Sequence, residues 1–184
     1  SMSPLLWDPL HGTRSIRPLL WDPLHGTRSI RPLLWDPLHG TAFQGGEFVD
    51  GKRHGQGTET WPNGDYYEGS YKNDLFDGLG TLATTGAKYV GMFKHGLKHG
   101  KGRITFKNKA FYDGMWQEGR MHGNGTYMWP DGREYTGMWA GGLRHGQGSM
   151  GWLNGERYEG PWEGGEMHGN GCWMYTNGKS RWGE

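Results

Sequence analysis

Histidines recur along the sequence, and they are the first side chains whose type and spacing could do chemistry. The series is His54, His99, His122, His145 and His168, and Asp77 holds the corresponding place after His54. On successive β-hairpins such positions lie roughly 10 Å apart, whereas zinc ligands lie ~2.0–2.2 Å from one shared ion. We therefore predict no metal site, and we expect each histidine to pack at a turn and to bond to nearby backbone.

The other residue types found in enzyme sites form no constellation either. Cys172 is the single cysteine, and no histidine stands at a recognisable motif spacing from it, so we predict a buried thiol on a strand. The recurring Gly-x-Gly lacks the strand-to-helix junction that dinucleotide binding requires. We predict no catalytic residue, no cofactor and no enzymatic activity. A lone cysteine cannot form an internal disulfide, which favours a reducing, intracellular setting.

Basic residues gather in one window of the sequence. Seven of them and no acid lie from Lys88 to Lys109, while the formal net charge of the whole chain is only +1, which argues against nucleic-acid binding. The window is either an ordinary solvated face or a patch for an acidic partner or anionic lipid, where each basic residue contributes on the order of 1 kcal/mol. The candidate anion-binding residues are Lys94, Lys98, Lys101, Arg103 and Lys107.

The backbone that must position these side chains is a repeat. Gly-x-Gly recurs every 22 or 23 residues, and an aromatic-x-Gly-x-aromatic pattern such as Tyr112-x-Gly114-x-Trp116 precedes it. This period of two residues indicates a strand with one apolar face. Asn-Gly pairs such as Asn63-Gly64 predict hairpin turns in which both residues have positive φ. At the equivalent place Asn108-Lys109 breaks the pattern, and we expect a looser turn there.

Composition indicates how such strands bury apolar surface. The chain has 36 glycines and 11 tryptophans among 184 residues, so aromatic rings must lie against bare backbone, a form of aromatic rescue. The predicted fold is all-β: a linear stack of β-hairpin repeats that forms an elongated, twisted, single-layer antiparallel sheet with an aromatic groove. No window approaches the ~18 consecutive apolar residues of a membrane-spanning segment.

The sequence divides into a leader and an array. Residues 1–41 form the leader, in which Ser1 before Met2 resembles the remnant of a removed tag and PLLWDPLHGTRSIR repeats from Pro4 onward. Its prolines favour extended backbone, so we predict a flexible or extended segment. The alternatives are a row of linear motifs that dock into a groove, or a short repeat that joins the array. The array, 42–184, comprises repeats 44–66, 67–88, 89–111, 112–134, 135–157 and 158–180 and a truncated seventh.

The pattern Tyr-x-Gly-x-Trp-x-x-Gly-x-x-His-Gly-x-Gly over residues 44–183 resembles the MORN (membrane occupation and recognition nexus) repeat. The resemblance implies the hairpin-stack fold. It also implies a scaffold or adaptor of the kind found in cilia, at membrane junctions and on myosin tails. Some members of the family have been proposed to bind phosphoinositides, and others capture an extended partner segment.

We predict a non-enzymatic scaffold that binds a protein segment, extended or helical, apolar with acidic residues, along the aromatic groove. The alternative is a peripheral membrane module that binds anionic phospholipids through the basic third repeat. Self-association through the array ends or the leader is a further expectation, and so is a cytoplasmic location associated with the cytoskeleton or membranes. The predicted groove residues are Tyr89, Phe93, Tyr112, Trp116, Trp129, Tyr135, Trp139, Trp152, Tyr158 and Trp162.

Overall fold

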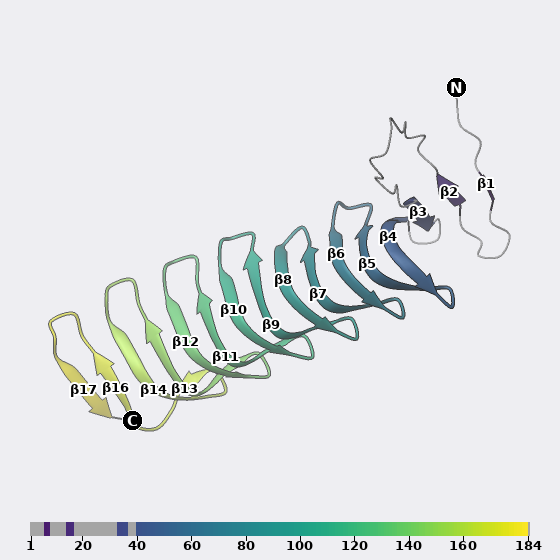
Figure 1. Ribbon diagram of the computed structural model, residues 1–184. Coiled ribbons are helices and arrows are strands. Elements are labelled where there is room, and N and C mark those ends of the chain that lie inside the picture. Colours follow the sequence, from purple (N-terminus) through teal and green to yellow (C-terminus); the bar gives the residue numbers. More distant parts are fainter. Residues whose placement is uncertain (1–5, 8–13, 17–32, 37–39, 184) are drawn as a thin grey trace, which may run out of the picture. The chain divides into compact units, whose positions relative to one another are not determined.

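A computed structural model describes residues 6–7, 14–16, 33–36 and 40–183, and every regular element in these ranges is a β-strand. The chain divides into two units, Ser1–Thr85 and Gly86–Glu184, called here the N-terminal unit and the C-terminal unit. Within each unit, most strands that follow one another in the sequence pair antiparallel (Figure 1). The described residues include no helix that could span a membrane. The prediction of an all-β hairpin array is confirmed.

The N-terminal unit contains the leader and the first hairpins. Its strands are β1 (Leu6–Trp7), β2 (Arg14–Ile16), β3 (Leu33–Asp36), β4 (Thr41–Val49), β5 (Lys52–Thr60), β6 (Tyr66–Lys72) and β7 (Leu75–Ala83). The short leader strands pair β1 with β2, β2 with β3 and β3 with β4, so part of the leader extends the ladder of the array. The rest of the predicted leader, 1–5, 8–13, 17–32 and 37–39, lies outside the described residues.

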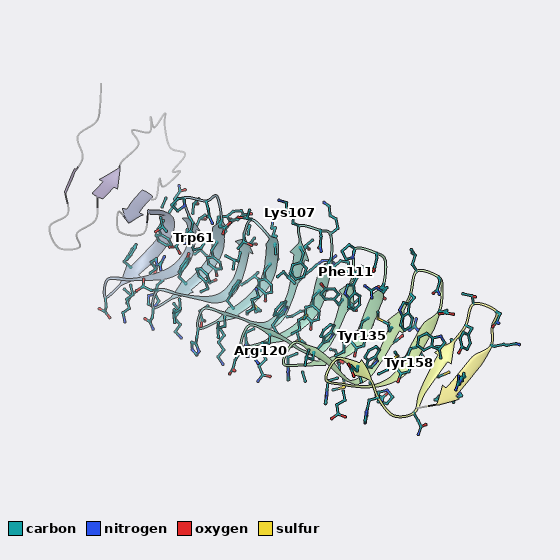
Figure 2. All side chains as sticks on the ribbon, turned by 180° about the vertical axis from the view of Figure 1, so that it is seen from behind. Trp61, Lys107, Phe111, Arg120, Tyr135 and Tyr158 are labelled. Carbon is teal, nitrogen blue, oxygen red and sulfur yellow. The ribbon has the colours of Figure 1, made fainter. Side chains whose placement is uncertain are left out.

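The C-terminal unit contains the most regular repeats. Its strands are β8 (Ala87–Lys94), β9 (Leu97–Phe106), β10 (Phe111–Gln117), β11 (Arg120–Met128), β12 (Glu134–Ala140), β13 (Leu143–Gly151), β14 (Arg157–Glu163), β15 (Glu166–Met167), β16 (Gly171–Met174) and β17 (Ser180–Gly183). In Figure 2, Lys107 and Arg120 lie at opposite ends of the strands of this sheet, and Tyr135 and Tyr158 lie further along the array toward its C-terminal strands.

A row of glycines crosses the strands and makes room for the tyrosine rings. Gly114 pairs with Gly102 on one side and with Gly125 on the other, and Gly125 pairs in turn with Gly137. A Cβ added to Gly114 would lie 2.5 Å from the Tyr112 hydroxyl oxygen. Any side chain at these positions would therefore displace a ring, and this explains the second glycine of each Gly-x-Gly.

The first glycine of each Gly-x-Gly is required for a different reason, which is its backbone conformation. Gly123 has a φ of 58°, a left-handed conformation that side chains with a Cβ rarely adopt. It belongs to a β-bulge, because the register of β10 against β11 shifts between Gly114 and Met115. The shift leaves Gly123 and Asn124 of β11 without partners in β10, so β11 carries two more residues than β10 over this stretch while its side chains keep alternating between the faces.

The tight turns lie at the opposite ends of the hairpins from those predicted. Of the pair Asn63-Gly64 only the glycine has positive φ, and Gly64 N donates to the Trp61 carbonyl over 3.0 Å, which makes a three-residue loop. The assignment of paired positive φ values to the Asn-Gly turns is wrong. Paired values occur instead at the two-residue turns within each repeat, as at Glu118 (49°) and Gly119 (80°).

The predicted looser turn at Asn108-Lys109 is also wrong. Lys109 N donates to the Phe106 carbonyl over 2.9 Å, and Phe106 N donates to the Ala110 carbonyl over 2.8 Å, as in the glycine-containing loops. Lys109 adopts a φ of 74°, where other repeats have glycine. The loop keeps its geometry and accepts backbone strain at one residue.

Candidate functional site

The tyrosines of the C-terminal unit form the floor of one face of its sheet, called here the aromatic face. The floor tyrosines are Tyr89, Tyr112, Tyr135 and Tyr158, and all of them are buried. The Tyr112 hydroxyl donates to the Met115 carbonyl over 2.8 Å, and Tyr135 makes the same bond to Met138 over 2.9 Å. Burial raises the pKa of Tyr112 and of Tyr135 to about 12. These phenols therefore stay protonated near neutral pH.

Tryptophan rings join one repeat to the next. The Trp116 ring stands edge-on between Tyr112 of its own repeat, at 5.2 Å, and Tyr89 of the preceding repeat, at 5.3 Å. Trp139 is placed in the same way between Tyr135 and Tyr112. The Trp116 indole N–H donates to the Gly102 carbonyl over 2.9 Å. The Trp116 ring is therefore packed between tyrosines, and its indole N–H is hydrogen-bonded, within the sheet.

Most of the predicted groove residues belong to this floor. Those that are buried are Tyr89, Phe93, Tyr112, Trp116, Tyr135, Trp139, Tyr158 and Trp162. Trp129 and Trp152 are half-buried. Aromatic residues on the inward face of a strand look alike in sequence, so the pattern does not separate the core from the surface that a ligand reaches.

A second ring column lies beside the floor and is partly open. Tyr127 and Trp129 are 4.6 Å apart, and Trp152 stacks on Trp173 at 4.7 Å. Tyr127 and Trp173 were not among the predicted residues, because other repeats have different residue types in that register. Beside Trp173 is a hollow of about 280 Å³, lined by Tyr158, Met167, Gly169, Gly171, Trp173, Tyr175, Arg181 and Gly183. Among the described residues, the buried Trp173 indole nitrogen finds no hydrogen-bond partner.

Besides Arg133, which lies over Trp129 and is paired with Asp131, two cations lie against the rings of the aromatic face. The Lys98 Nζ is 5.3 Å from the centre of the Trp116 ring and 5.5 Å from that of Tyr89. The Arg144 guanidinium lies 4.4 Å above Trp162 and donates to the Gly165 carbonyl. Burial lowers the pKa of each cation. Within residues 40–183 neither cation forms an ion pair with a carboxylate.

The predicted anion-binding residues do not share one face. Lys98 is on the aromatic face, whereas Lys94, Lys101 and Arg103 alternate to the opposite face because they flank inward-pointing residues. Lys107 lies in the loop between β9 and β10. Arg103 is 3.4 Å from Asp113.

The histidines are mostly exposed. His122 and His145 are exposed, and His122 pairs across the strands with Met115, on the face opposite the floor. The His54 Nδ1 is 3.4 Å from the Lys52 carbonyl oxygen, and the His168 Nε2 is 3.3 Å from Glu163. The described residues contain no group of His, Cys, Asp and Glu that could hold a metal ion. Cys172 is buried in β16.

Comparison with known families and proteins agrees with this architecture. A family model described as MORN repeat matches residues 46–66, 67–85, 89–110, 112–132, 135–157 and 158–180. Alsin from Rattus norvegicus and alsin from Homo sapiens are each 34% identical over 67 residues. These alignments cover 33% of this chain but only 4% of alsin, so the chain spans a small part of the length of the curated relatives it matches.

A solved structure of similar fold is the TCP domain of SAS-4 (dCPAP) from Drosophila melanogaster, in complex with a proline-rich motif of Ana2 (dSTIL). The TM-score is 0.53, and the comparison covers 100% of this chain and 97% of that chain. The sequence identity is 12%, so the likeness concerns the fold alone.

Proposed function

The chain belongs to the MORN repeat family, and from this we propose that it is a non-enzymatic scaffold that binds a segment of a partner protein along its aromatic face. The observation that carries the proposal is the half-buried second ring column, in which Tyr127, Trp129 and Trp152 stay partly open beside a buried floor. Tyrosine and tryptophan side chains dominate the energetics of protein interfaces. The setting we propose is intracellular, on a cytoskeletal or membrane-associated structure.

The polar atoms of the floor support binding over reaction. The tyrosine hydroxyls donate to backbone carbonyls, as Tyr112 does to Met115, and their raised pKa values leave no phenolate to act as a base at neutral pH. The tryptophan N–H groups are also engaged, as Trp139 is with the Gly125 carbonyl at 3.1 Å. A partner segment would therefore meet apolar ring surface and the two cations rather than a reactive group.

The similar TCP domain of SAS-4 supports an extended partner. In that structure a proline-rich motif of another protein is bound. Because only the fold is shared, it supports the general idea that an open antiparallel sheet of this kind accepts a peptide. The residues that a partner segment would need are set by the side chains of the aromatic face and not by this likeness of fold.

A peptide-display experiment tests the proposal. Random peptides of about 12 residues, long enough to cross four strands when extended, are selected on the immobilised full chain. The affinity of each enriched peptide is then measured by fluorescence anisotropy. Trp129→Ala combined with Trp152→Ala should weaken binding about 30-fold, as expected when interface tryptophans are removed.

The matched control is on the opposite face, where Met92→Ala and Met115→Ala remove exposed apolar side chains and should leave affinity unchanged. The mass of the full chain in solution is measured first, so that self-association through the array ends or the leader is not taken for peptide binding. The proposal fails if no peptide is enriched, or if the tryptophan variant, still folded by circular dichroism, binds as tightly as the parent.

Anionic lipid is a second candidate ligand, for the opposite face of the third repeat. Lys94 and Lys101 are exposed there together with Val90 (46%) and Met92 (41%), a mixture of charge and apolar surface. Such surfaces attract anionic membranes. Co-sedimentation with phosphatidylserine vesicles should weaken with added salt and be lost in Lys94→Glu with Lys101→Glu. Binding that is unchanged by added salt and by the two substitutions would exclude anionic lipid as the ligand of this face.

A further inference from the structure

One position of the repeat carries a cation in alternate repeats. It is occupied by Arg53, Lys98 and Arg144, and in the repeats between and after them by Phe76, Met121 and Met167. In each hairpin this residue pairs with the second strand aromatic, as Lys98 pairs with Phe93 and Arg144 with Trp139. The three cations therefore have equivalent places against the rings, and their surroundings can be compared.

In the N-terminal unit the chain itself neutralises the cation. The Arg53 Nη1 is 2.8 Å from Glu59 Oε2, and its Nε is 3.2 Å from Asp74 Oδ1. The guanidinium lies 5.0 Å from the centre of the Tyr71 ring, and the Tyr71 hydroxyl donates to Glu59. Burial, the largest single effect, would lower the pKa of Arg53, but the charge and hydrogen bond of Glu59, together with Tyr71 and Asp74, outweigh burial and raise the pKa.

Within residues 40–183, neither carboxylate has a counterpart around Lys98 or Arg144. Glu59 pairs with Tyr67, and the residue in the same register beside Lys98 is Ile104, which pairs with Tyr112. Beside Arg144 it is Met150, which pairs with Tyr158. The sequence thus replaces a buried acid by a buried apolar residue at both places.

The second acid is replaced in the turn of the next hairpin. Asp74 N donates to the Arg53 carbonyl over 3.1 Å. The equivalent donors are Gly119, at 2.9 Å from the Lys98 carbonyl, and Gly165, at 3.0 Å from that of Arg144. The backbone contact is conserved between the repeats, while the carboxylate that completes the site around Arg53 is absent.

We propose that Lys98 and Arg144 are docking points for two carboxylates of the partner segment, which take the places that Glu59 and Asp74 hold around Arg53. This rests on the proposed function, because it names the chemistry of the segment bound on the aromatic face. Cations against aromatic rings without an acid favour an anionic partner. The occupant is therefore an acidic stretch of another protein.

The register fixes the spacing of the two acids. Lys98 lies in β9 and Arg144 in β13, four strands apart, which is ~19 Å at ~4.8 Å per strand. An extended segment rises ~3.3 Å per residue, so its two acidic residues stand about six positions apart. An even number places both on the same side of the segment. Met121, between the two cations in this column, would face an apolar residue of the segment.

Substitutions at the turn glycine give a matched test. Gly119 has a φ of 80° and open space where a Cβ would lie, and Asp74 adopts 69° at the equivalent place. Gly119→Asp should supply the missing carboxylate to Lys98 from within the chain. It should weaken binding of the enriched acidic peptides at least about 10-fold. Gly119→Asn has the same size without the charge and should bind as the parent does.

Substitutions of the cations complete the test. Lys98→Met and Arg144→Met introduce the residue that other repeats carry there, so the fold is retained, and each should also weaken binding at least about 10-fold. Arg120→Met removes an exposed charge at the neighbouring turn and should have no effect. Replacing either acid of the peptide by its amide should weaken binding to the parent. The same replacement should not weaken binding any further when the cation that the acid faces has already been changed to methionine.

The outcomes separate this inference from the proposed function. If no peptide is enriched on the full chain, both fail. The inference alone is overturned if peptides bind through Trp129 and Trp152 but lack paired acids. It is also overturned if Gly119→Asp and Gly119→Asn bind equally well, or if amide peptides bind to the parent as tightly as acidic ones.

Discussion

Gly125→Ala tests the idea that the glycine row exists to hold the tyrosine rings. An added Cβ would lie 2.5 Å from Cε2 and Cζ of Tyr112, whereas carbon atoms in contact are ~3.5–4.0 Å apart. The ring or the strand must therefore move by roughly 1 Å. Tyr112 is 0% exposed and stands between the edges of Trp116 and Trp139, so the ring has no free space to enter.

Overpacking of this kind costs about 1–3 kcal/mol. For a chain of this length a loss of about 2 kcal/mol lowers the melting temperature by roughly 4–8 °C. The assay is thermal unfolding of the full chain, followed by tryptophan fluorescence and by far-ultraviolet circular dichroism. Two signals are needed because the repeats of an array can unfold in parts.

The control is Gly151→Ala, in a strand of the same unit where an added Cβ meets nothing within 4 Å. There alanine should be neutral or should stabilise by about 0.5–1 kcal/mol, because glycine loses more backbone freedom on folding. In a Tyr112→Leu background the cost of Gly125→Ala should fall, since the obstructing ring is gone. Equal effects of Gly125→Ala and Gly151→Ala would refute the packing role of the glycine row.

Three other changes have expected outcomes. Lys109→Gly should raise stability in urea unfolding by about 1 kcal/mol, because it relieves a positive φ at a side-chain-bearing residue; an unchanged midpoint would contradict this. The pKa values of Tyr112 and Tyr135, raised from 10.0 to about 12, mean that the unfolded chain releases these protons first. Their contribution to stability is then present below pH 10 and lost as the pH rises through 12, so urea midpoints that stay constant over this range would oppose the assignment. Arg53→Met should destabilise by about 2–3 kcal/mol, discounted for the partial exposure of the pair, and adding Glu59→Leu should recover most of the loss in the same assay.

The hairpin architecture could be predicted from the sequence because its signals are local. The aromatic-x-Gly-x-aromatic pattern predicts a strand and its inward face, as at Tyr112 and Trp116. The regular spacing of this pattern along the sequence predicts the repeat. The two reasons for Gly-x-Gly could not be separated in this way. Gly123 is required by a bulge and Gly125 by a ring, and only the pairing of strands tells them apart.

The candidate site was less predictable, because it depends on which side chains lie above others. Trp116 and Trp129 look alike in sequence, yet one is buried between tyrosines and the other is half-buried. Lys98 lies in a basic window with Lys94 and Lys101, but strand alternation brings it to the rings and the others to the opposite face. The missing acids at Ile104 and Gly119 become visible only when they are compared with the neutralised Arg53.

Three junctions between hairpins of the C-terminal unit share one geometry. Trp116, Trp139 and Trp162 each meet the tyrosine of the preceding repeat edge-on, at 5.3, 5.3 and 5.1 Å, and each donates to a glycine carbonyl. If one whole repeat were removed, the next tryptophan would pack against an equivalent tyrosine and donate to an equivalent glycine carbonyl. Evolution can therefore lengthen or shorten such a chain by interchangeable modules, and the distance between its two cations would change in steps of ~10 Å.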